Sequence, residues 1–316
     1  MTVSVIRILS NLLFAASLAL ILSLVVITFY DDFEGVLASE EKLYPPDQEF
    51  PIGDCQSWTD VVRDFNVTSE DGAREVAVLM YHRMIDDKDL SDIHYDENGE
   101  LHSTIITKSE FDKQMAFLNE KNYVSLTAKE LQLFLEEKIE VPKKSIVLTF
   151  DGGFKDTAAV AYPVLKQNNL TALNFLITGT VTKANPQFDP GDVQYLSTTD
   201  LKDICDVFEF QSHTYNMHQN LINNKDFFEI KSKEEIQLDL ETSIINLGGG
   251  NRSFAYPYGA NNEKTIDILK ESGFKMAFTT KYKNAKPRED IYQIPRKGVY
   301  HGTSIKKFKE AINFDE

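Results

Sequence analysis

The pattern that most limits the fold of this chain begins at about Val76, where short apolar runs start to alternate with helical patterns. Each run has the length and the β-branched or apolar content of a buried strand. The runs cover residues 76–81, 145–150, 172–177, 207–211, 253–256 and 275–280. Strands that alternate with helices are typical of a parallel sheet with crossover helices. Over about 240 residues, a closed or nearly closed (β/α) barrel is expected, and an open doubly wound sheet is the alternative.

The N-terminal region carries one long apolar run, Leu9–Tyr30, which contains no charged residue. Its length matches the roughly 20 residues needed to cross a bilayer and exceeds the roughly 7–15 of a signal-peptide core. Arg7 precedes the run and acidic residues follow from Asp31. The positive-inside rule then predicts a cytoplasmic N-terminus (1–8), a transmembrane anchor (9–30) and an extracytoplasmic remainder in the cell membrane. The alternative is secretion after signal cleavage near residues 36–38.

Residues 31–75 form an acidic segment with thirteen acids, three bases and three prolines. Like charge and low hydrophobicity favour an extended stem between the membrane and the domain at 76–316. The alternative is that this segment packs on the domain as an additional layer. Cys55 lies in it, and the second cysteine is Cys205. Outside the cytoplasm the two could form a disulfide, and two separate thiols are the other possibility.

The charge and the motifs of the chain exclude two classes of partner. A net charge of −16 argues against a nucleic acid, because phosphate binding requires a basic surface. No GxGxxG or GxxxxGK[ST] motif follows a predicted strand, so no nucleotide site is expected.

Residues able to carry chemistry recur where the predicted strands end. They are His82, Asp151, His213, His218, Tyr256, Pro257, Tyr258 and Arg296. Because strand ends gather at one face of a barrel, these residues are expected to surround one site. Neutral imidazoles suit a divalent transition metal, and two histidines five residues apart can share one if the chain turns between them. Taken singly, the acid could instead cap a helix, and the histidines could be strand-end or surface residues.

In this order, the motifs resemble the polysaccharide deacetylases, the NodB-homology carbohydrate esterases. Their first signature is similar to TFDGGFKDTAAVAYPVLKQNNLTALNFLITG, their histidine signature to SHTYNMH and their groove-forming signature to FAYPYG. LMYHRM and the late IPR resemble the poly-N-acetylglucosamine deacetylase branch. The resemblance covers residues 76–312. It implies a distorted (β/α)7 barrel that removes N-acetyl groups from a β-linked N-acetylglucosamine polysaccharide with a divalent metal, zinc or else cobalt, nickel or manganese.

The resemblance assigns a role to each matching residue. Asp151 matches the general base and His82 the general acid, while His213 and His218 match two metal ligands. The family's third metal ligand, an aspartate, is replaced by Gly152. Zinc sites in proteins normally have three or four protein ligands, so metal binding is expected to be weakened or lost. The alternative function is therefore a catalytically impaired barrel that binds glycan.

Four further residues match the substrate groove of the family. The backbone N–H of Tyr258 matches the oxyanion donor. Tyr256 and Pro257 would shape the groove wall, and Arg296 would orient the base or bind substrate. A glycoside hydrolase would need a second strand-end carboxylate, which the sequence does not offer. The acidic loop at 86–102, with its two histidines, is expected to be solvated, or else to cover the groove.

Overall fold

The computed structural model describes residues 13–14, 16–21, 23, 43–219, 227–249 and 253–314. The chain divides into two units, Met1–Leu43 and Tyr44–Glu316. Most of the anchor predicted at 9–30 lies outside the described residues. Among the residues that are described, no helix is both long enough and apolar enough to span a bilayer.

The unit Tyr44–Glu316 is built on a parallel sheet with the strand order β10-β1-β5-β6-β7-β8-β9, in which β4 also pairs with β5. Its strands are β1 (Ala77–Tyr81), β4 (Val124–Ser125), β5 (Ser145–Gly152), β6 (Ala172–Leu176), β7 (Phe208–Ser212), β8 (Ser253–Ala255), β9 (Met276–Phe278) and β10 (Lys297–Gly298). All of these pairs are parallel. A separate parallel pair joins β2 (Arg83–Ile85) and β3 (Ile105–Thr107).

The strand order distinguishes between the two predicted architectures. It follows the chain from β1 to β9 without the reversal that a doubly wound sheet requires. The last strand, β10, lies beside the first. Just before β10, Ile294 bridges Phe278 at the end of β9, so the sheet curls and its two edges approach each other. The predicted parallel α/β class is thus confirmed at the level of a curled sheet, and the doubly wound alternative is wrong.

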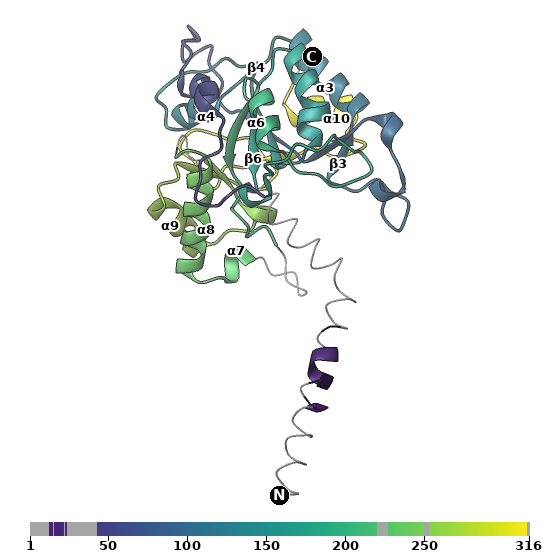
Figure 1. Cartoon of the computed structure of the whole chain (residues 1–316). Helices are drawn as coiled ribbons and strands as arrows, with labels where there is room; N and C mark the ends of the chain where they lie inside the picture. Colours follow the sequence, from purple (N-terminus) through teal and green to yellow (C-terminus); the bar gives the residue numbers. More distant parts are fainter. Residues whose placement is uncertain are drawn as a thin grey trace, which may run out of the picture. The chain divides into compact units, whose positions relative to one another are not determined.

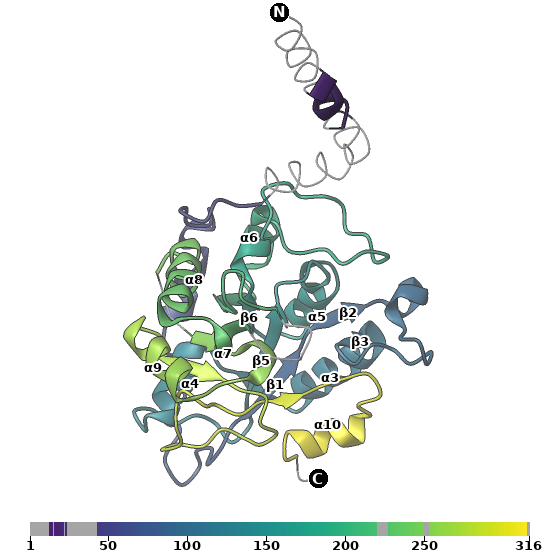
Figure 2. The same ribbon diagram turned by 90° about the horizontal axis from the view of Figure 1, so that it is seen from below.

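Helices cover the outside of this sheet. Figure 2 shows β1, β5 and β6 near the centre of the view, with α3, α5, α6 and α8 arranged around them. The α-helices of the described residues in this unit (Figure 1) are α3 (Lys108–Glu120), α4 (Ala128–Leu135), α5 (Tyr162–Gln167), α6 (Thr198–Ile204), α7 (Phe227–Ile230), α8 (Lys233–Asn246), α9 (Glu263–Glu271) and α10 (Ile305–Ala311). The short helical turns are η1 (Gly53–Asp60), η2 (Asp87–Asp89), η3 (Asp92–His94), η4 (Thr157–Ala161), η5 (Thr178–Thr180) and η6 (Pro257–Gly259).

The strands are buried on both faces, which explains why they read as continuous apolar runs. Within β1, Val78 packs into a cluster with Val147 and Phe278 inside the curl of the sheet. The next residue, Leu79, packs instead with Phe111 of α3 in the layer between sheet and helices. Because side chains alternate along a strand, each β-run supplies both layers of the core.

The described part of the predicted stem, residues 44–75, packs against the sheet and helices, so the alternative of an additional layer applies. The side chain of Gln56 forms hydrogen bonds with backbone groups of β7 that a neighbouring strand would otherwise form. Its Nε2 donates to Phe208 O at 2.9 Å and its Oε1 accepts from Phe210 N at 3.0 Å. These backbone groups need a partner because, within the part of the chain that the structure describes, β8 pairs with β7 only at Ser212. The predicted domain boundary at Val76 therefore lies inside the folded unit.

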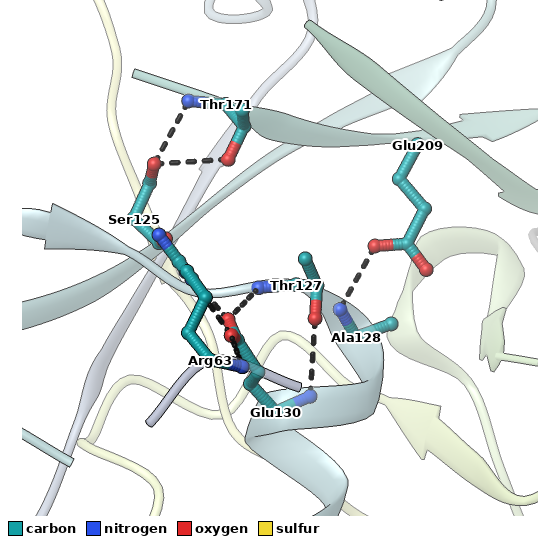
Figure 3. A network of polar contacts seen from close by, with 7 residues as sticks. All are labelled: Arg63, Ser125, Thr127, Ala128, Glu130, Thr171 and Glu209. Carbon is teal, nitrogen blue, oxygen red and sulfur yellow. Dashed lines mark hydrogen bonds and ion pairs between the residues drawn. The ribbon is translucent and has the colours of Figure 1, made fainter. Parts of the chain in front are cut away.

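Two further contacts fix this segment. A disulfide joins Cys55 to Cys205, which settles the question left open by the sequence. Arg63 donates to both carboxylate oxygens of Glu130, the buried acid that also completes the N-terminal capping box of α4 with Thr127 (Figure 3). The segment looked like a solvated spacer because it is acidic, and composition does not reveal these specific partners.

Replacing both cysteines with serine is expected to lower the free energy of unfolding by about 2–5 kcal/mol. The disulfide closes a loop across a sequence separation of 150 residues, so it restricts the unfolded chain strongly. Urea denaturation of the full chain with and without reductant measures the effect. Reductant should shift the natural protein to the midpoint of the variant and leave the variant unchanged. An unchanged midpoint for the natural protein would contradict this role.

Candidate active site

Six of the eight predicted residues line a pocket of about 390 Å³ at the carboxyl ends of the strands. The other two are Pro257, which is buried in η6, and Arg296, which is buried and contacts Asp151. His82 directly follows β1, and Asp151 is the second-last residue of β5. His213 follows β7 and Tyr256 follows β8. The pocket is lined by His82, Asp151, Gly152, Phe154, Tyr195, His213, His218, Tyr256 and Tyr258, among others. The residues predicted from strand ends therefore lie at one end of the sheet.

Asp151 and Arg296 form a buried ion pair at the base of the pocket. Arg296 lies just before β10 and is fully buried. Its Nη1 donates to Asp151 Oδ1 at 2.6 Å and its Nη2 to Oδ2 at 2.7 Å. Nη1 also donates to Thr149 Oγ1 at 3.1 Å, and Nε donates to Thr279 O at 3.1 Å. The paired geometry fixes the plane of the carboxylate.

The charge states at the site follow from burial and from this pair. Burial raises the pKa of Asp151, but the charge and the hydrogen bonds of Arg296 outweigh this effect and hold the pKa well below its usual range. Burial lowers the pKa of His213 to about 3. Burial also lowers the pKa of His82 and of His218, although the carboxylate of Asp151 opposes this. At neutral pH the pocket thus holds one carboxylate and three neutral imidazoles.

The two histidines of the SHTYNMH motif lie side by side, with ring centroids 4.6 Å apart. His213 Nδ1 is 2.7 Å from the carbonyl oxygen of Ala255, which can only accept, so Nδ1 carries the proton and Nε2 has a free lone pair. The ring of Tyr258 lies 4.5 Å from that of His218. Tyr258 is half exposed and has φ +54°, so a left-handed turn directs its side chain toward the histidine.

His82 also lines this pocket and is partly buried. Its Nδ1 is buried and, among the described residues, has no hydrogen-bond partner. The sequence left open that His82 is a strand-end histidine hydrogen-bonded to the backbone. Its Nδ1 makes no such bond to the described residues. A ring nitrogen of this kind can take part in proton transfer with a group that enters the pocket.

Gly152, beside Asp151, has a backbone that disfavours any larger residue. Its φ of +104° lies in the region that residues with a side chain rarely adopt. A Cβ at this position would lie 2.5 Å from Cε2 of Phe154. The ring of Phe154 is held in place because it stacks on Tyr195 at 5.3 Å and lies under the guanidinium of Arg83 at 5.7 Å.

Comparison with known proteins decides the family. The chain is 30% identical over 226 residues to a poly-β-1,6-N-acetyl-D-glucosamine N-deacetylase of Staphylococcus aureus (strain MRSA252), covering 69% of this chain and 76% of that protein. The chain belongs to the polysaccharide deacetylase family. The family model, described as polysaccharide deacetylase, matches residues 138–277. A Staphylococcus epidermidis protein of the same name is 30% identical over 246 residues, covering 75% of this chain and 83% of that protein.

Solved structures of similar fold support the assignment of the architecture. A Streptococcus pyogenes deacetylase, PplD, in complex with acetate superposes with a TM-score of 0.63 at 24% identity, covering 75% of this chain and 98% of that one. IcaB from Ammonifex degensii gives a TM-score of 0.61 at 24% identity, covering 77% and 97%. At this identity the likeness concerns the fold.

The donor set of this polysaccharide deacetylase does not complete a three-ligand metal site. His213 and His218 offer two imidazoles, and Asp151, the carboxylate that lines the pocket, is ion-paired with Arg296. Within the described ranges, no group of three or more histidine, cysteine, aspartate or glutamate side chains could hold a metal ion. The side chain of Phe154 occupies the space that a ligand at position 152 would need.

Sequence reasoning missed part of this deacetylase pocket. Phe154 and Tyr195 form one wall, and Tyr195 comes from a long irregular loop that gives no periodic signal. The loop at 86–102 was expected to be solvated, and for His94 this is wrong. His94 is fully buried, and its Nε2 contacts Pro190 O at 2.9 Å, which joins the two loops. His102 is exposed, as expected.

Proposed function

We propose that this chain removes N-acetyl groups from a polymer of N-acetylglucosamine, releasing acetate and leaving free amines. The observation that carries the proposal is the 30% identity to poly-β-1,6-N-acetyl-D-glucosamine N-deacetylases over most of both chains. The pocket supports it, because it brings a carboxylate and three imidazoles together beside aromatic walls that can hold a sugar.

The proposed chemistry is hydrolysis of an amide by water. Asp151 would remove a proton from the attacking water, since it stays ionised throughout the physiological range. The backbone N–H of Tyr258 would stabilise the tetrahedral oxyanion. His82, neutral in the resting pocket, would take up a proton, and its imidazolium would then deliver that proton to the nitrogen as the carbon–nitrogen bond breaks, giving acetate and an amine. Arg296 would hold the base in its orientation, and Tyr256 and Pro257 would form the groove wall.

A divalent metal is used in this family, and His213 and His218 are the residues of this chain that would contact one. Because two imidazoles do not complete the site, no step of the proposed chemistry is assigned to a metal. This observation also favours a second candidate function, a barrel that binds the glycan without cleaving it.

Acetate release by the full chain from β-1,6-linked N-acetylglucosamine oligomers tests both candidates. The assay would be run as purified, with chelator, and with added Zn²⁺ or Co²⁺, beside calorimetric measurement of oligomer binding. Release of acetate supports the deacetylase. Binding without release in every arm supports the glycan-binding alternative. If the chain shows neither oligomer binding nor acetate release, both candidate functions are contradicted.

Gly152→Asp alone is expected to give no increase in acetate release or in metal affinity, and to lower stability by about 1–3 kcal/mol. The positive φ and the ring of Phe154 both oppose the new side chain. The double variant Gly152→Asp/Phe154→Ala removes the steric conflict and should bind Zn²⁺ more tightly than either single variant. Phe154→Ala is the matched control. Tight Zn²⁺ binding by the single Gly152→Asp variant would contradict the steric argument.

The proposed location is the outer face of the cell membrane, with Leu9–Tyr30 as the anchor. The uncharged run and the charges on its two sides support this, as does a disulfide, which persists in oxidising compartments. Protease treatment of intact cells should remove the domain while a cytoplasmic marker survives. Recovery of the full-length chain in the culture medium would contradict anchoring.

A further inference from the structure

The spacing of the two pocket histidines depends on a sharp turn at Thr214. This residue is fully buried and has φ +77°, a conformation that is rare for a β-branched residue. Its carbonyl oxygen accepts a hydrogen bond from Thr178 N at 3.1 Å, which ties one side of the turn to the segment after β6. A backbone in this region persists only where surrounding groups hold it.

The other side of the turn is held by Asp239 of α8. One carboxylate oxygen accepts from Tyr215 N at 2.8 Å and the other accepts from Asn216 N at 2.7 Å. The residue is 7% exposed. Burying a carboxylate is costly unless specific hydrogen bonds satisfy it, and here both oxygens are committed to the turn.

Helix α8 also contacts Ser212, the residue that directly precedes His213. One turn beyond Asp239, Ser243 places its Oγ 2.8 Å from Oγ of Ser212, and both residues are buried. Ser212 directly precedes His213, whereas the Asp239 contacts lie just before His218. Helix α8 therefore fixes the backbone on both sides of Thr214, and with it the 4.6 Å separation of the two rings.

We infer that Asp239 is a positioning residue, which sets the geometry of the His213–His218 pair through the Tyr215 and Asn216 amides. For its effect on catalysis this inference rests on the proposed function. Groups that orient a pocket histidine from behind commonly change activity by about 10–100-fold, because small displacements of reacting groups are costly.

The test is Asp239→Asn in the full chain. Asparagine keeps the shape but turns an NH2 group toward one of the two amides, so one hydrogen bond is lost. The kcat for acetate release should fall about 10–100-fold while KM stays within about two-fold. Hydrogen–deuterium exchange of the 213–219 peptide, followed by mass spectrometry, should become at least about ten-fold faster.

Two control variants separate positioning from stability. Glu241→Gln changes an exposed acid on α8 and should alter neither measurement. Ile236→Val weakens the buried face of α8, so it should lower Tm without speeding exchange of the 213–219 peptide more than that of the rest of the chain. Unchanged exchange in Asp239→Asn would overturn the inference, as would faster exchange with unchanged kcat. If the natural chain releases no acetate, the proposed function fails, and the exchange measurement still decides whether Asp239 holds the turn.

Discussion

Asp151→Asn is expected to lower kcat for acetate release by about 10²–10⁴-fold, the contribution of a general base. The neutral amide cannot take a proton from water, although it has the same shape. Glycan binding should persist, because the walls of the pocket formed by Phe154, Tyr195 and Tyr258 do not change. The measurement is steady-state acetate release, with oligomer binding followed by calorimetry on the same preparation.

The control for Asp151→Asn is Asp203→Asn, which removes an exposed acid of α6 and should leave kcat unchanged. Because the variant also breaks a buried ion pair, both proteins must be assayed well below their unfolding midpoints. An Asp151→Asn protein that keeps a tenth or more of the natural rate would show that another group takes the proton. His82 would then be the next residue to replace, since its Nδ1 is buried and unpartnered among the described residues.

The sequence was informative where chemistry depends on strand ends. Parallel strands bring their carboxyl ends to one side, so His82, Asp151 and His213 could be grouped before any contact was known. The order of the motifs then indicated the family. Arg296 was assigned only loosely, because its contact with Asp151 joins residues 145 positions apart and leaves no local pattern.

The same reasoning failed where a residue's environment is set by distant partners. Composition made the segment before Val76 look like a solvated stem, yet Gln56 completes the edge of β7 and Cys55 is bonded to Cys205. His94 stands among acidic residues, but it is buried because a second loop packs on it through Pro190. Charge density describes a segment on average, whereas burial depends on single contacts.

Arg296→Gln is expected to lower the free energy of unfolding at pH 7 by about 3–5 kcal/mol. The substitution leaves the carboxylate of Asp151 buried without its counter-charge. It also removes the contacts of the guanidinium with the rings of Phe175 and Phe278 at 5.5 and 6.0 Å. The control is Arg288→Gln, which breaks an exposed pair with Glu137 and should have a much smaller effect. Urea denaturation measures both.

The pH dependence distinguishes the lost counter-charge from simple loss of packing. In the natural protein the folded pKa of Asp151 is depressed, so its pair stabilises the fold above the ordinary carboxylate pKa of about 4 and this contribution fades as pH falls further. Without Arg296, burial should instead raise that pKa, so protonation should begin to relieve the penalty as the pH falls below neutral. The difference in unfolding free energy between the two proteins should therefore shrink from pH 7 to pH 5. A difference that stays constant would mean that packing, rather than charge, accounts for the loss. The double variant Asp151→Asn/Arg296→Gln should recover part of the stability at pH 7, because it leaves no buried charge without a partner.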